Sequence, residues 1–263
     1  MVTFATWNVN SVNKRLPNLL AWLDSFSPDV LMLQELKTVE EKFPFLEIQE
    51  RGYHVEVLGQ KSYNGVALLS KAPLENVIKG LPGYESDEQA RYIEATTFGI
   101  RVGGLYLPNG NPLGTEKFPY KLEWMDHLIS HARALLKTEQ PVLLGGDYNL
   151  IPTDDDVYNP KLFEKDALTQ PESRARFRTL LNLGYTEAWR SLHRESHVYS
   201  YWDYTKRAYE HDNGIRIDHL LLSPQAADLL VKCEIDKAPR GEESPSDHTP
   251  VWCELSVDPA EQE

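Results

Sequence analysis

Side chains able to bind a cation or move a proton stand at the ends of several apolar segments. Asn8 follows the first such segment, Glu35 follows the second, and Asp147 follows Val142 to Gly145. Carboxylate and amide oxygens without cysteine suit a hard cation such as Mg²⁺ or Mn²⁺. Any one of these residues, taken alone, is more simply explained as a turn residue or a strand-end cap. Their number favours a common site, and the full set is Asn8, Glu35, Asp147, Asn149, Asp218, Asp247 and His248.

The segment Leu144 to Asn149 places two glycines before two polar residues. Glycines allow a sharp turn, and a spacing of two puts Asp147 and Asn149 on one face if the strand continues. A carboxylate there can align or deprotonate an attacking water, while the amide holds that water in line with the leaving oxygen. A plain turn is the alternative, because Gly-Asp pairs are common in loops.

A second constellation joins two aspartates and a histidine near the C-terminus. Asp247 and His248 precede a late apolar segment, and Asp218 lies within Ile217 to Leu222. An aspartate that accepts from one imidazole nitrogen fixes the histidine tautomer and favours its protonated state. The other nitrogen can then stabilise charge on phosphate oxygens. We expect Asp218 to pair with His248 in this way.

Apolar patterning predicts the elements that must position these residues. The expected strands are 2–8, 30–33, 53–58, 65–70, 92–98, 100–107, 142–145, 217–222 and 250–255, and the expected helices are 16–23, 117–137, 172–183 and 224–231. This order predicts an α/β fold with two sheets packed face to face and helices outside. We expect a single domain over 1–257 and a short acidic tail, 258–263.

Composition narrows the classes of protein. Apolar residues make up 41% of the chain and charged residues 25%, which is enough for one sizeable core. Cys233 and Cys253 form no CxxC motif, so we expect reduced core thiols rather than a disulfide framework or a zinc finger. A strand-like segment follows Met1 without signal-peptide features, and no apolar segment approaches the ~18 residues of a membrane span. We expect a protein of the bacterial cytoplasm.

The formal net charge of −13 argues against a nucleic-acid partner at first sight, because phosphate backbones attract Lys and Arg. Binding, however, depends on the local potential of one face, and a divalent cation can invert that potential at an acidic site. The acidity of the chain therefore does not exclude DNA.

Seven segments together resemble the exonuclease III family of bacterial apurinic/apyrimidinic (AP) endonucleases, within the endonuclease/exonuclease/phosphatase superfamily. Each is weak alone, but their order and separation cover nearly the whole chain and are specific together. They are Thr6 to Ser11, Leu33 to Lys37, Tyr63 to Ala67, Tyr106 to Gly110, Gly146 to Asn149, Ile215 to Asp218 and Ser246 to Pro250. The resemblance implies a deoxyribonuclease-I-like, four-layer α/β sandwich with two mixed sheets.

The resemblance also implies roles for individual residues. Glu35 would be the principal Mg²⁺ ligand, with Mn²⁺ as a substitute ion. Asp147 would orient or activate the attacking water, and Tyr106 would contact the phosphate. The implied metal set is Asn8, Glu35, Asp147, Asn149, Asp247 and His248, and the implied catalytic set is Tyr106, Asp147, Asn149, Asp218 and His248.

Substrate binding is expected from cationic, amide and aromatic side chains. Arginine can clamp phosphate with two hydrogen bonds, and aromatic rings can stack on a base or line a pocket for a flipped-out abasic sugar. The alternative is that Trp202 is a half-buried core residue and the cations are solvated surface. The expected DNA-binding set is Asn10, Lys37, Asn64, Arg91, Trp202, Lys206, Arg207 and Arg216, with Tyr201 and Tyr204 as further aromatics.

These expectations point to Mg²⁺-assisted hydrolysis of double-stranded DNA 5′ to abasic sites. The same chemistry would serve 3′-phosphodiesterase, 3′-phosphatase or 3′-to-5′ exonuclease activity at blocked 3′ ends, and we expect the protein to act as a monomer. Two alternatives stay open. One keeps the fold but changes the substrate to an inositol phosphate, sphingomyelin or another nucleotide ester, and the other is a DNA-binding relative whose active site has decayed.

Overall fold

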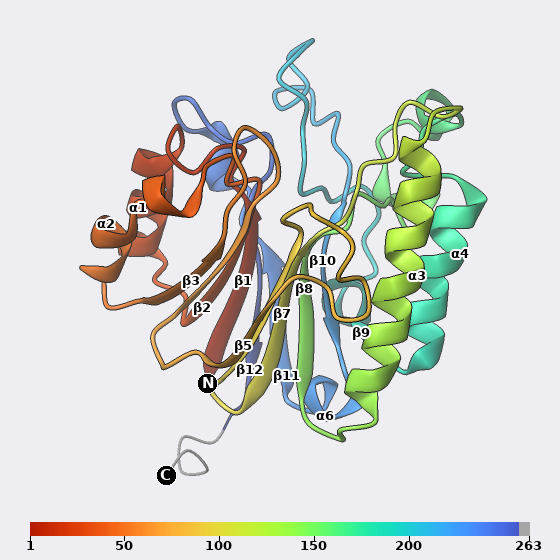
Figure 1. The fold of residues 1–263 in the computed structure, drawn as a ribbon. Helices are drawn as coiled ribbons and strands as arrows, with labels where there is room; N and C mark the ends of the chain where they lie inside the picture. Colours follow the sequence, from red (N-terminus) through yellow and green to blue (C-terminus); the bar gives the residue numbers. More distant parts are fainter. Residues whose placement is uncertain (258–263) are drawn as a thin grey trace.

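The computed structural model describes residues 1–257 as two β-sheets between two layers of helices (Figure 1). The predicted acidic tail, 258–263, lies outside the described residues. The first sheet has the strand order β11-β12-β1-β2-β4-β3. Its strands are β1 (Val2–Asn8), β2 (Val30–Gln34), β3 (His54–Leu58), β4 (Val66–Ser70), β11 (Leu230–Ile235) and β12 (Val251–Leu255).

The second sheet has the strand order β5-β6-β7-β8-β10-β9. Its strands are β5 (Glu75–Lys79), β6 (Tyr92–Thr97), β7 (Ile100–Tyr106), β8 (Val142–Asp147), β9 (Thr186–Glu187) and β10 (Asp218–Leu222). The pairs β1/β2 and β7/β8 are parallel, and the other pairs are antiparallel. Both sheets are therefore mixed, as the resemblance implied.

Helices cover the outer face of each sheet (Figure 1). On one side lie α1 (Leu16–Ser25) and α2 (Phe45–Gln49), and on the other lie α3 (Lys117–Leu136) and α4 (Pro171–Leu183). Two shorter helices are α5 (Ala188–Leu192) and α6 (Pro224–Ala227). The 3₁₀ turns are η1 (Glu40–Lys42), η2 (Asp154–Asp156), η3 (Pro160–Phe163) and η4 (Ala238–Gly241). No helix within residues 1–257 is both long and apolar enough to span a membrane.

The two faces of β2 show how the layers form. Val30 and Met32 join the core between the sheets, whereas Leu31 and Leu33 pack in the cluster that contains α1 residues such as Leu19. Successive strand side chains point to opposite faces, so a strand that is apolar at every position must be covered on both sides. Full burial of each such side chain contributes roughly 1.5–3 kcal/mol.

The predicted helix 224–231 is wrong in its second half. Ser223 caps the start, since its side chain accepts a hydrogen bond from the backbone N–H of Ala226. The helix nevertheless ends at Ala227, and β11 begins at Leu230 and pairs with β12. Pairing with a neighbouring strand outweighs local helix preference here. The edge strand β5 was not predicted, because its mostly exposed residues carry no apolar alternation.

Strand register brings three of the predicted site residues into one row. Tyr106 on β7 is paired with Asp147 on β8, and Asp147 is paired with Asp218 on β10. Residues directly opposite one another in a sheet project from the same face. In the other sheet, Asn8 is paired with Gln34, so Glu35 follows at the same edge. The ends of five strands from both sheets thus surround one place.

Candidate active site

Asp147 lies at the centre of the site, at the end of β8. Gly146 must be glycine, because a Cβ atom there would lie 1.9 Å from the carbonyl oxygen of Leu105. The buried Asp147 carboxylate accepts hydrogen bonds from Asn8 Nδ2 and the Asn149 N–H, each at 2.9 Å. Burial raises the pKa of Asp147, and the negative charge of Asp218 adds to this, although His248 lowers it.

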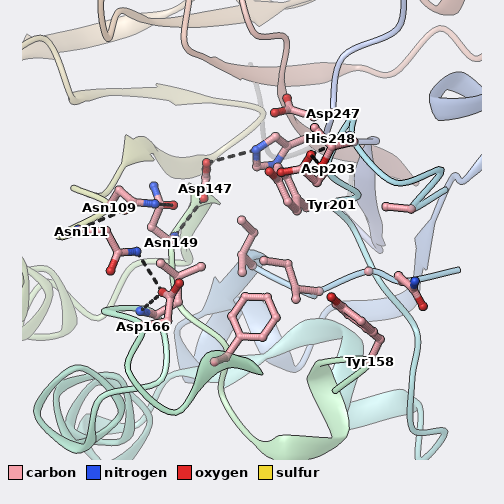
Figure 2. Close-up of a pocket in the computed structure, with 18 of the residues that line it drawn as sticks. Asn109, Asn111, Asp147, Asn149, Tyr158, Asp166, Tyr201, Asp203, Asp247 and His248 are labelled. Atoms are coloured by element: carbon pink, nitrogen blue, oxygen red, sulfur yellow. Dashed lines mark hydrogen bonds and ion pairs between the residues drawn. The ribbon is translucent and has the colours of Figure 1, made fainter. Parts of the chain in front are cut away.

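His248 faces Asp147 from the loop before β12 (Figure 2). Its Nδ1 lies 2.9 Å from Asp218 Oδ2, so the expected pair is present, and its Nε2 lies 3.6 Å from Asp147 Oδ2. Ser200 Oγ donates to Asp218 Oδ2 at 2.6 Å. Burial alone lowers the pKa of His248, but Asp218 and Asp147 outweigh burial and raise it. The imidazole is therefore held as an imidazolium.

Glu35 completes the group from the edge of the first sheet. Its backbone has a φ of 51°, a left-handed conformation that non-glycine residues adopt mainly under constraint from their surroundings. The Oε1 atom accepts from Asn8 Nδ2 and from the Tyr106 hydroxyl, both at 2.9 Å, and Oε2 lies 3.0 Å from Lys37 Nζ. Burial raises the pKa of Glu35, but Lys37 and Asn8 together lower it further, so Glu35 is ionised.

This group of side chains fits a hard cation. Glu35, Asp147 and His248 bring ligand-type atoms within 4.8 Å of one another. With Asp218 buried behind them, three carboxylates face two cations, the His248 imidazolium and the Lys37 ammonium, so negative charge is in excess. Carboxylate oxygens in a partly open site are the ligands that Mg²⁺ and Mn²⁺ prefer.

The remaining members of the implied metal set are oriented differently. Asn8 directs its Nδ2 toward Glu35 and Asp147, while its Oδ1 accepts from the Asn10 N–H at 3.0 Å. Asn149 Oδ1 accepts from Asn109 Nδ2 at 3.1 Å. Asp247 lies outside the cluster of Glu35, Asp147 and His248. In this structure Asn8 links the two carboxylates as a hydrogen-bond donor, and its implied role as a metal ligand stays a prediction.

A cavity of about 450 Å³ opens above this group. One wall is polar and includes Asp147, Asn149 and His248, which Figure 2 shows close together. Apolar and aromatic side chains also line the cavity, and they include Phe163, Leu168, Tyr201, Ile215 and Ile217. Tyr201 lies beside His248, with ring centroids 5.0 Å apart. A space lined by both charged and apolar groups can hold a phosphate next to an uncharged ring.

One residue of the expected DNA-binding set lines this cavity, and several others lie near it or line a neighbouring hollow. Lys37 donates to Asn10 Oδ1 at 2.6 Å, beside Glu35. Asn64 and Arg91 line a neighbouring hollow of about 340 Å³, which shares Asn109 with the main cavity. Lys206 lines the main cavity, and Arg207 is exposed next to it.

Two further residues of that set are almost completely buried and line neither hollow. Arg216 is 1% exposed and forms ion pairs with Asp156 at 2.8 Å and Glu187 at 3.1 Å, so its guanidinium cannot reach DNA. Trp202 is also 1% exposed, and its Nε1 donates to Asp212. The expectation that these two residues bind DNA is corrected, because both side chains are enclosed within the fold. The neighbouring Tyr201 is one of four aromatic residues that line the cavity, with Tyr106, Tyr158 and Phe163.

Two contributors were missed at the level of sequence. Asn109 holds the amide of Asn149, and Ser200 orients Asp218. Asn109 stands in the segment Tyr106 to Gly110, so its position after a strand end was a usable signal. Ser200 has no such signal, because its contact spans 18 residues of irregular chain.

Known proteins are similar to nearly the whole chain. The model of the Endonuclease/Exonuclease/phosphatase family matches residues 5–248. Exodeoxyribonuclease III of Haemophilus influenzae is 34% identical over 264 residues, which cover 96% of this chain and 99% of that protein. DNA repair nuclease APEX1 of Danio rerio is 30% identical, over 96% of this chain and 81% of that protein.

Solved structures show the same similarity. The 3′ phosphatase NExo from Neisseria, bound to a product DNA hairpin, gives a TM-score of 0.94 at 39% identity, covering 97% of this chain and 99% of that chain. An AP endonuclease from Archaeoglobus fulgidus gives 0.94 at 35% identity, covering 98% and 100%. The chain belongs to the endonuclease/exonuclease/phosphatase family, and the expected family and fold are confirmed.

Proposed function

We propose that the protein is a metal-dependent DNA repair nuclease that hydrolyses phosphodiester bonds at abasic sites or blocked 3′ ends of double-stranded DNA. One observation carries the proposal: His248 Nε2 and Asp147 Oδ2 face each other at 3.6 Å beside an open cavity. The names of the relatives, which include exodeoxyribonuclease III, a DNA-bound 3′ phosphatase and an AP endonuclease, support DNA as the substrate.

Asp147 and His248 divide the proton chemistry. Its raised pKa makes Asp147 a better proton acceptor than an ordinary aspartate, so it can take a proton from the attacking water. The water oxygen bonds to phosphorus as the bond to the leaving oxygen breaks. His248, protonated and held by Asp218, donates its Nε2–H to a phosphate oxygen as charge grows there. Tyr106 stays protonated, because burial raises its pKa well above the usual range.

Glu35 would be the principal ligand of a metal ion, and Asp147, which takes the proton, would lie beside the ion. An imidazolium has no free lone pair, so His248 would stand next to the ion and contact the phosphate instead. When bound, Mg²⁺ or Mn²⁺ would offset the negative charge of the phosphate and of the leaving oxygen. Without a cation, Glu35, Asp147 and Asp247 repel an incoming phosphate.

The cavity suits a deoxyribose that has lost its base. Its apolar and aromatic lining, which includes Phe163, Leu168, Tyr201, Ile215 and Ile217, can cover a sugar ring turned out of the duplex. Lys37, Arg91, Lys206 and Arg207 would bind neighbouring phosphates. Despite a net charge of −13, these cations would lie on the face that meets DNA.

The cellular setting is part of the same proposal. We propose a monomer in the bacterial cytoplasm that acts on the nucleoid. The similarity to exodeoxyribonuclease III of Haemophilus influenzae, a bacterial protein, covers 99% of that protein and supports this setting.

The test compares three labelled duplexes: one with an internal abasic site, one with a 3′-phosphate and one with an undamaged recessed 3′ end. We expect cleavage in Mg²⁺ or Mn²⁺ and none in EDTA. We expect Glu35→Gln to require a higher Mg²⁺ concentration for half-maximal rate, because one charged ligand is lost. The exposed Glu50→Gln serves as the control.

The outcomes separate the alternatives. DNA binding without cleavage of any duplex in either metal would favour a decayed relative. Absence of both binding and cleavage, with hydrolysis of an inositol phosphate or a nucleotide ester, would assign the fold to another phosphoester. Relative rates on the three duplexes then decide which repair activity dominates.

A further inference from the structure

Lys121 is a buried lysine that the chemistry above does not use. It lies on α3 and is fully buried. Its aliphatic chain runs beside Gly110, where a Cβ atom would lie 2.7 Å from Lys121 Cδ and 3.1 Å from Ala167 Cβ. Gly110 also has a φ of +87°, which favours glycine. The absence of a side chain at Gly110 therefore opens the path along which the lysine reaches inward.

The amine of Lys121 ends on the two loops that carry polar residues of the site. Its Nζ donates to the backbone carbonyl of Asn149 at 2.5 Å and to that of Asn109 at 3.1 Å. Asn109 lies after β7 and Asn149 after β8. The Lys121 side chain thus connects the two segments that follow the neighbouring parallel strands β7 and β8.

The contact with Asn149 matters because that residue is held in an unusual conformation. Its φ is 44°, and its N–H donates to Asp147 Oδ1 at 2.9 Å. Its side chain is fixed at both ends, by Asn109 Nδ2 at 3.1 Å and by the carbonyl of Leu107 at 2.8 Å. Figure 2 shows Asn109, Asn149 and Asp147 in sequence along the cavity.

We propose that Lys121 is a positioning residue for phosphodiester hydrolysis: by binding both loop carbonyls it holds Asn149, and through Asn149 it orients Asp147. The proposal rests on the nuclease function proposed above. It assigns the lysine no contact with DNA. A small displacement of reacting groups can cost ~10²-fold in rate, so a support of this kind has a measurable effect.

The proposal does not depend on the charge of the lysine. Burial lowers the pKa of Lys121 to about 7, although Asp166 and Asp147 raise it. A neutral amine still carries two N–H bonds, so both hydrogen bonds persist in either protonation state.

The test replaces Lys121 by methionine, which keeps the length of the chain and removes both donors. Cleavage is measured with whichever of the three duplexes the wild-type protein cuts fastest, under single-turnover conditions. We expect a fall of ~10²-fold in rate at saturating DNA and a change of less than about threefold in DNA affinity. The control is Lys137→Met, which removes an exposed lysine from the C-terminal end of α3.

A double-mutant cycle separates positioning from a purely structural role. If Lys121 acts by orienting the Asp147 carboxylate, Lys121→Met should cost less than about threefold in rate when added to Asp147→Asn, whereas Asn149→Ala would keep the backbone groups that connect Lys121 to Asp147. An equal loss in both backgrounds, or a folded Lys121→Met variant with wild-type rate, would overturn the proposal. Should the methionine variant fail to fold by circular dichroism, Lys121→Gln enters the same cycle with the same expected outcomes. Inactivity of the wild-type protein on every duplex would refute the nuclease function and, with it, this proposal.

Discussion

Two buried ionic clusters lie on either side of the start of β10, and they differ in charge balance. The first, which we call the arginine cluster, contains Arg216 and Arg190 with Asp156 and Glu187. The second, the catalytic cluster, contains Glu35, Asp147, Asp218 and His248. Arg216 and Asp218 are only two residues apart, so one short segment contributes to both.

The arginine cluster is balanced, and the catalytic cluster is not. Burial would raise the pKa of Asp156 and of Glu187, but Arg216 overcomes burial in both cases and lowers them. In the catalytic cluster, burial and Asp218 raise the pKa of Asp147 despite His248. A balanced cluster stabilises the fold, whereas an unbalanced one is complementary to a cation and to charge formed during a reaction.

The largest effect is expected from Asp147→Asn, which removes the proton acceptor of the catalytic cluster. The rate of DNA cleavage should fall by ~10² to 10⁴-fold. The free energy of unfolding in EDTA should stay equal or rise, because repulsion between Asp147 and Asp218 is relieved. Single-turnover cleavage and urea denaturation measure the two quantities. Asp156→Asn, the matched change in the arginine cluster, should lower stability instead, and the same response in both variants would contradict the comparison.

Arg216→Leu should have the next largest effect, and on stability. Loss of the guanidinium leaves Asp156 and Glu187 buried without their main cation, which costs roughly 3–5 kcal/mol. Urea denaturation measures this loss, with the exposed Arg178→Leu on α4 as the control. A folded Arg216→Leu variant of wild-type stability that binds DNA more weakly would restore the role that the sequence suggested for Arg216.

The contribution of the arginine cluster to stability should also depend on pH. The pKa of Glu187 is lowered to about 2, although burial would raise it, because Arg216 and His219 favour the ionised form. Because the pKa of Glu187 is lower in the folded state than in the unfolded state, its ionisation stabilises the fold. This contribution is fully present at pH values above the unfolded-state pKa near 4.5, and it is lost as the pH falls toward 2. Its full contribution is about 3 kcal/mol.

The free energy of unfolding of Glu187→Gln should therefore be lower than that of the wild-type protein. This difference should be smaller at pH 4 than at pH 6 by about 1 kcal/mol. Urea denaturation at both values measures the deficit against wild type. Glu50→Gln, at an exposed position, provides the control, and its difference from wild type should not follow this course. A Glu187→Gln deficit that is constant over this interval would show that the carboxylate is not held ionised by Arg216.

The catalytic cluster was largely predictable from sequence, and the arginine cluster was not. Asp147, Asp218 and Glu35 stand at strand ends, and strand ends can be located from apolar periodicity. Asp147 ends β8 and Asp218 begins β10, and the antiparallel pairing of these two strands brings both residues to one edge of the sheet. The structural role of Arg216 could not be predicted from the sequence, because its partner Asp156 is 60 residues away and no local pattern marks the two as partners.

The same limit explains the other differences. The helix expected over 224–231 stops because β11 pairs with β12, a contact that local preference does not encode. Trp202 is buried against Tyr199 and Ala208, so residue type alone misassigned it to the surface. Lys121 gave no signal, since an amphipathic helix normally exposes its lysines. Periodicity locates elements, but burial of a particular polar residue depends on contacts between distant segments.

The smallest effect is expected at Lys206, which lines the cavity but belongs to neither cluster. Each phosphate contact made by a lysine adds about 0.9 to the slope of log affinity against log salt. Lys206→Gln should therefore weaken DNA binding a few-fold and reduce that slope by about one, with little change in cleavage rate at saturating DNA. Fluorescence anisotropy in EDTA at several salt concentrations measures the slope, and Lys232→Gln, on the exposed edge strand β11, is the control. An unchanged slope would mean that Lys206 faces the cavity without binding a phosphate, and the electrostatic contribution to DNA binding would then have to come from Lys37, Arg91 and Arg207.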